Sequence, residues 1–137
     1  MTAINAFELY INAFALYTGI NGLLLMALAF NVVRHRQRAK VGFGTGGDEA
    51  LERACRVHGN AIEYVPVGLI IIGALALSSA PILVVHGIGI TLTLSRVLHA
   101  WGLSTSSGTS FGRAVGTLLT WVTLIVGSGF LIWTAIS

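Results

Sequence analysis

One short run of this apolar chain holds a dense group of ionisable side chains. Residues 52–66 read Glu-Arg-Ala-Cys-Arg-Val-His-Gly-Asn-Ala-Ile-Glu-Tyr-Val-Pro. At the helical period, five side chains fall within roughly 100° of one another on one face: Arg53, Arg56, Asn60, Glu63 and Tyr64. His58 points nearly the opposite way. Guanidinium groups bind carboxylates through paired hydrogen bonds, and a carboxylate binds an ammonium group. The face therefore fits a small ligand that carries both charges.

Two later segments add charge to this group. Arg96 and His99 lie one turn apart in a later apolar stretch, and Arg113 begins the last one. The competing interpretation is structural, because Arg56 and Glu63 could satisfy each other or a neighbouring helix, as polar pairs do inside membranes. The number of donors and acceptors exceeds what packing one helix needs. This surplus favours a ligand site.

The amino-acid composition indicates the class of protein that holds these residues. The chain has 137 residues, 55% of them hydrophobic and only 9% charged, where soluble domains have roughly 25% charged residues. The mean hydropathy is +0.84. So few charged residues could not cover the surface of a soluble enzyme, and they also exclude a disordered tail. The net charge is only +3 despite a pI near 9.6, so a nucleic-acid-binding domain is excluded as well. The single cysteine cannot form an internal disulfide.

Four stretches reach the roughly 20 apolar residues that a membrane-spanning helix needs. We expect spans at about 7–33, 57–79, 82–103 and 114–136. They use up most of the chain, so residues 1–137 are predicted to form one domain. The expected fold is an all-α integral membrane protein, a bundle of four transmembrane helices.

The basic residues predict the orientation of the spans. With four spans, the first and third connections share one side of the membrane and both termini share the other. The eight Lys and Arg residues lie in, beside or toward these two connections, and none is on the side of the termini. The positive-inside rule places such connections in the cytoplasm. We therefore expect a multi-pass membrane protein with both termini outside the cytoplasm.

The polar run resembles a known family signature. Glu-Arg-x-x-Arg-x-x-x-Asn-x-x-Glu-Tyr-x-Pro, residues 52–66, and Arg-Val-Leu-His, residues 96–99, are similar to motifs of the membrane-associated proteins in eicosanoid and glutathione metabolism (MAPEG). The resemblance covers essentially the whole chain and is to bacterial-type members, so it implies a location in the bacterial inner membrane. It implies a homotrimer with three glutathione sites, each between adjacent subunits and open to the cytoplasmic half, with glutathione as co-substrate.

The resemblance also implies roles for single residues. Arg113 matches the arginine that stabilises the glutathione thiolate. The expected glutathione-binding residues are Arg56, Asn60, Glu63, Tyr64, Arg96 and His99. Arg36 and His58 are expected to reach the site of the neighbouring subunit. One departure stands out, because Leu103 occupies a position where relatives have a tyrosine.

These expectations define one main function and two alternatives. The main one is the transfer of glutathione to lipophilic electrophiles, or the reduction of peroxides with it, at the membrane boundary. The first alternative is a non-catalytic protein of the same fold that binds lipids. Leu103 favours it, because relatives have a tyrosine at this position. A channel would need a continuous polar stripe, but the asparagines of the first span scatter over about 160°: Asn5, Asn12, Asn21 and Asn31. With one cysteine and four scattered histidines, no metal site is expected.

Overall fold

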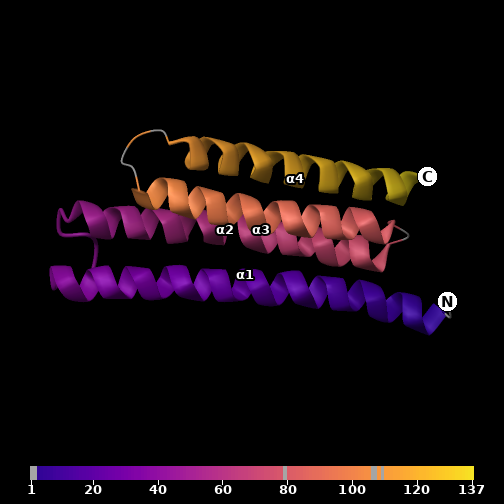
Figure 1. Ribbon diagram of the computed structural model, residues 1–137, viewed down its shortest axis with the longest axis horizontal. Helices are drawn as coiled ribbons and strands as arrows, with labels where there is room; N and C mark the ends of the chain where they lie inside the picture. Colours follow the sequence, from indigo (N-terminus) through magenta and orange to yellow (C-terminus); the bar gives the residue numbers. More distant parts are fainter. Residues whose placement is uncertain (1–2, 79, 106–107, 109) are drawn as a thin grey trace.

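Four long helices make up the protein in the computed structural model, which describes residues 3–78, 80–105, 108 and 110–137 (Figure 1). All four are long and apolar enough to cross a membrane. Their bounds are α1 Ala3–Ala39, α2 Glu49–Leu77, α3 Ile82–Thr105 and α4 Phe111–Ile136. The expected all-α, four-helix membrane bundle is confirmed.

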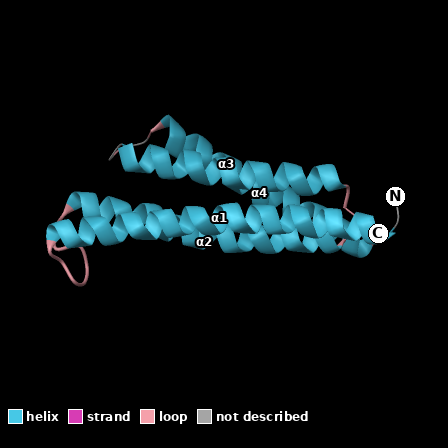
Figure 2. Cartoon of the chain, turned by 60° about the horizontal axis from the view of Figure 1, so that its bottom comes forward, coloured by secondary structure: helices cyan, strands magenta, loops and turns pink. Residues whose placement is uncertain are grey.

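The helices run alternately up and down. Both chain termini lie at one end of the bundle, and the connections after α1 and after α3 lie at the other end (Figure 1). We call the latter the loop end. α1 packs on α2, α2 on α3 and α3 on α4, whereas α1 and α4 make no contact through any described residue. Figure 2 shows the α1–α2 pair running alongside α3.

All four helices extend beyond the spans expected from hydropathy at one end or both, and the longest single extension is at the start of α2. This helix begins at Glu49, about two turns before residue 57. The Asp48 carboxylate accepts a hydrogen bond from the Leu51 amide at 2.7 Å, which caps the helix. Glu49 and Glu52 lie in its first turn, where carboxylates are favoured by the helix dipole. The polar residues of the site therefore belong to a continuous helix.

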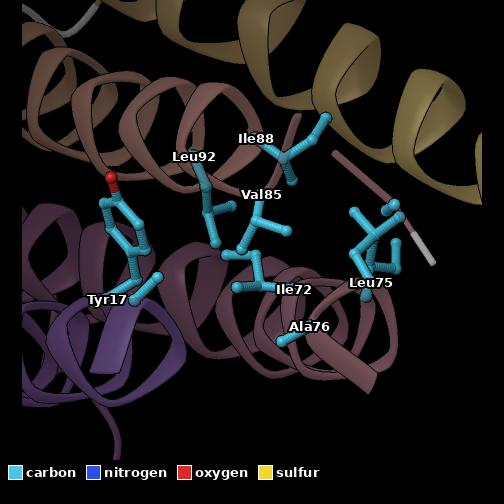
Figure 3. Packing of buried hydrophobic residues seen from close by; sticks show 10 residues of the cluster. Tyr17, Ile72, Leu75, Ala76, Val85, Ile88 and Leu92 are labelled. Atoms are coloured by element: carbon cyan, nitrogen blue, oxygen red, sulfur yellow. The ribbon is translucent and has the colours of Figure 1, made fainter. Parts of the chain in front are cut away.

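The hydrophobic core lies among α1, α2 and α3 (Figure 3). Tyr17, Ile72, Leu75, Val85 and Leu92 are its most buried large side chains, and each is at most 4% exposed. Removing this apolar surface from water or lipid contact and packing it densely holds the three helices together.

Two hydrogen-bonded pairs join α1 to α3 beside this core. The Tyr17 hydroxyl lies 2.9 Å from His86 Nδ1, and the Asn21 amide nitrogen donates to Thr93 Oγ1 at 2.9 Å. Among the asparagines of α1, Asn21 therefore acts as a contact between helices and not as part of a polar channel. Such bonds contribute about 0.6–2 kcal/mol each inside membranes.

Candidate functional site

A polar cavity of about 700 Å³ lies at the loop end, between α2, α3 and α4. Its lining residues are Glu49, Glu52, Arg53, Arg56, Asn60, Leu103 and Arg113. The five from α2 are spaced so that they repeat on one helix face. α3 contributes only Leu103, and α4 contributes only Arg113. Three of the predicted site residues, Arg56, Asn60 and Arg113, are thus brought to one cavity.

Arg113 is held in place by the first turn of α4. The Ser110 hydroxyl accepts a hydrogen bond from the Arg113 amide at 3.3 Å and donates one to the Gly102 carbonyl of α3 at 2.7 Å. This N-cap therefore ties the start of α4 to the end of α3. The arrangement fixes the backbone from which the Arg113 side chain reaches the cavity.

Glycines let α3 and α4 approach closely behind Arg113. Gly112 and Gly116 form a Gly-x-x-x-Gly pair on the buried face of α4, a pattern that brings membrane helices together. A Cβ atom on Gly116 would lie 2.6 Å from the His99 amide nitrogen and 2.6 Å from the Ser95 carbonyl oxygen. These are backbone atoms, so the helices themselves would have to move apart.

We expect Gly116→Leu to loosen this contact and lower the unfolding temperature. Overpacking a close interface costs about 1–3 kcal/mol. The measurement is thermal unfolding of the detergent-purified variant. Gly129→Leu is the matched control, because a Cβ there meets nothing within 4 Å. Equal unfolding temperatures for the two variants would contradict the proposed role of Gly116.

The charged groups of the cavity do not pair with one another. Within the described part of the chain, the side chains of Arg53, Arg56 and Arg113 make no hydrogen bond or ion pair, and neither do those of Glu49 and Glu52. The structural alternative, in which Arg56 pairs with Glu63, is not observed. The cavity therefore presents guanidinium and carboxylate groups that are open to a ligand.

Arg96 lies behind the cavity wall, not in it. Its side chain is 2% exposed, and it donates to Asn60 Oδ1 at 2.8 Å, to the Gly116 carbonyl at 3.3 Å and to Thr120 Oγ1. Its guanidinium carbon lies 5.3 Å from the centre of the Tyr64 ring, a cation–π contact. Because Arg96 occupies the oxygen of the Asn60 amide, the NH₂ group of that amide is left for another partner.

The other predicted ligand residues lie outside the cavity lining. Tyr64 packs under Arg96, and its hydroxyl accepts a weak hydrogen bond from Trp121 Nε1 at 3.4 Å. His99 is 5% exposed and buried at the α3–α4 contact. Glu63 is exposed on the outer surface of α2. In a single chain, the cavity ends at Asn60.

The two residues expected to serve a neighbouring subunit also lie away from this cavity. His58 is half-buried on another face of α2. Arg36 donates to the Val41 carbonyl at 3.3 Å and to the Gly44 carbonyl at 3.0 Å, so it braces the loop of its own chain. Their contribution to a neighbour stays a prediction.

Sequence reasoning did not single out Glu49 and Glu52 as site residues. Glu49 precedes the quoted motif, and Glu52 opens the motif but was given no role, because the apolar span was expected to begin only near residue 57. The usable signal was the Asp48 cap with acidic residues directly after it, which is typical of a helix start. Extending the helix to Asp48 would have placed both carboxylates on the face of Arg53 and Arg56.

The family model described as the MAPEG family matches residues 14–133. Inner membrane protein YecN of Escherichia coli strain K12 is 40% identical over 88 residues, which cover 64% of this chain and 67% of that protein. The protein of the same name from Escherichia coli O6:H1 strain CFT073 matches to the same extent. With its four apolar helices, this chain is a multi-pass bacterial inner membrane protein that belongs to the MAPEG family.

Proposed function

We propose that the cavity binds glutathione and activates its thiol for reaction with lipophilic electrophiles or peroxides. The observation that carries this proposal is the set of unpaired charges in one cavity, with Arg56 from α2 and Arg113 from α4 on its walls. Glutathione carries two carboxylates, one ammonium group and one thiol. Guanidinium groups suit the carboxylates, and Glu49 or Glu52 suits the ammonium group.

The position of Glu63 supports an assembled form of the protein. An ionisable side chain inside a membrane span costs about 2.5–3.5 kcal/mol on insertion scales, yet Glu63 is exposed on α2. Contact with a second copy of the chain would remove this carboxylate from lipid. We therefore propose a homotrimer in which Glu63 and Tyr64 complete the glutathione site at a subunit boundary, together with Arg36 and His58 of the neighbouring subunit.

The charge distribution supports access from the cytoplasm. The cavity lies at the loop end, where the basic residues of the chain gather. By the positive-inside rule this end faces the cytoplasm, the compartment that keeps glutathione reduced. A lipophilic substrate would enter from the bilayer side of the same site.

The chemistry proceeds from the thiolate, since it is the nucleophilic form. In conjugation, the thiolate sulfur bonds to an electrophilic carbon, and the leaving group departs with the electron pair of its broken bond. In peroxide reduction, two glutathione thiols are oxidised to one disulfide while the hydroperoxide is reduced to an alcohol and water. In both reactions, Arg113 would stabilise the anionic sulfur.

Calorimetric titration of glutathione tests the binding step. We expect Arg56→Ala to weaken binding about tenfold, because one charge-assisted contact is lost while Arg53 remains beside it. Arg38→Ala is the matched control, since it removes the same charge from the exposed end of α1. Equal affinities in wild type and Arg56→Ala would contradict the assignment of this cavity. Glu63→Gln tests the completed site in the same way.

One observation favours a second candidate function. Leu103 lines the cavity at a position where the family resemblance implies a tyrosine hydroxyl. This wall of the cavity is therefore suited to the apolar part of a ligand. A lipid-binding protein without catalysis would use such a wall. Purified protein that binds glutathione and turns over chlorodinitrobenzene would exclude this second function.

A further inference from the structure

We propose that a second, smaller pocket binds the phosphate group of a phospholipid from the adjacent membrane leaflet. This pocket of about 130 Å³ lies at the loop end between α1, α2 and α3. Its lining residues are Asn31, His35, Ala50, Arg53, Ala54 and Ser104. The proposed ligand and site are separate from the glutathione cavity, although Arg53 lines both.

The lining chemistry points to an oxyanion. Arg53 offers a guanidinium group, His35 an imidazole, Asn31 an amide and Ser104 a hydroxyl, so each can donate a hydrogen bond. Throughout the described residues, none of these four side chains has a hydrogen-bond partner or an ion pair. No described residue that lines this pocket carries a carboxylate, whereas two of those that line the larger cavity do. This difference favours an anion here and a ligand of mixed charge there.

The pocket is built by three helix ends. Asn31 and His35 are one turn apart on α1 and therefore share a face. Ala50, Arg53 and Ala54 belong to the first two turns of α2, the helix end that carries a partial positive charge and attracts phosphate groups. Ser104 comes from the last turn of α3. The volume suits one tetrahedral oxyanion and is too small for a tripeptide.

The depth of the pocket favours a lipid as the source of the phosphate. The apolar stretches end near residues 33 and 103, so Asn31, His35 and Ser104 lie within a few residues of the membrane boundary. Phospholipid headgroups occupy this level, and basic pockets between helices on the cytoplasmic side recognise them. A free phosphate ion would share the chemistry but not this placement.

Native mass spectrometry of the detergent-purified protein tests the proposal with three probes: short-chain phosphatidylglycerol, diacylglycerol of the same chain length, and inorganic phosphate. We expect bound phosphatidylglycerol and little diacylglycerol. The double variant His35→Ala/Ser104→Ala should bind phosphatidylglycerol roughly tenfold more weakly, because two hydrogen bonds to a charged group are lost. Arg38→Ala, with its side chain outside the pocket, should bind it like the wild type.

Each outcome decides for or against the site. Neither His35 nor Ser104 lines the larger cavity, so unchanged glutathione affinity in the double variant shows that the protein is folded and separates the two sites. Binding of inorganic phosphate that the double variant loses, without binding of phosphatidylglycerol, would keep the oxyanion site but overturn the lipid source. The site itself would be overturned if the double variant bound phosphatidylglycerol as tightly as the wild type does. It would also be overturned if the wild type bound diacylglycerol as tightly as phosphatidylglycerol.

Discussion

Replacing Arg113 with alanine is expected to lower the turnover number about 25-fold at neutral pH, in proportion to the thiolate fraction, while the dissociation constant of glutathione changes no more than about threefold. A free thiol has a pKa of about 8.5, so only a few per cent is thiolate at neutral pH. Lowering the pKa of the bound thiol by about two units takes about 2.7 kcal/mol. One guanidinium group beside the sulfur can supply that energy, since a nearby opposite charge lowers the pKa of an acid by about one to three units. Chlorodinitrobenzene conjugation measures the turnover.

The pH dependence distinguishes thiolate stabilisation from a general loss of structure. In the wild type, the pKa of the bound thiol should be about 6.5, and in Arg113→Ala it should return toward about 8.5. The thiolate fractions of wild type and variant therefore differ most between pH 6.5 and pH 8.5, and they converge above about pH 8.5. Ultraviolet absorbance of the bound thiolate measures this titration directly.

Arg113→Lys is the matched variant for the charge. It keeps a cation at the same position and should retain much of the lowered pKa of the thiol. Turnover by Arg113→Ala that equals the wild type would remove Arg113 from the mechanism. A loss that persists undiminished at alkaline pH would show that Arg113 orients the ligand and does not ionise the thiol.

The fold was predictable because membrane spans can be recognised from long apolar stretches of sequence. About 20 consecutive apolar residues have few alternatives to a transmembrane helix, and four such stretches predict the alternating bundle. The start of α2 was not predicted because hydropathy measures where lipid contact ends, not where hydrogen bonding ends. The carboxylate of Asp48 continues the helix into the aqueous layer, and the cavity depends on these extra turns.

The site was predictable in part. Helical periodicity placed Arg56 and Asn60 on one face, and the family resemblance added Arg113, which lines the same cavity. Periodicity does not say how deep a cavity extends along a face. Arg96 and Tyr64 fill the space beyond Asn60, and Glu63 lies exposed on the surface. Such outcomes depend on packing between helices that are distant in sequence.

Replacing Arg96 with leucine is expected to weaken glutathione binding about 30-fold through Asn60. Arg96 does not line the cavity, but its hydrogen bond of 2.8 Å fixes the Asn60 amide. A hydrogen bond to a charged group contributes about 1.5–3 kcal/mol, and about 2 kcal/mol corresponds to 30-fold in affinity. We therefore expect Arg96 to act as a positioning residue. Calorimetric titration of glutathione measures the change.

A double-mutant cycle separates this positioning role from a general loss of stability. If Arg96 acts through Asn60, glutathione affinity in Arg96→Leu/Asn60→Ala should nearly equal that in Asn60→Ala alone, because the residue that Arg96 orients is already gone. Thr120→Val is the control, since it removes another partner of Arg96 and leaves the bond to Asn60 in place. Additive losses in the cycle would show that Arg96 and Asn60 act independently. A loss in Thr120→Val as large as in Arg96→Leu would assign the effect to packing of α3 against α4.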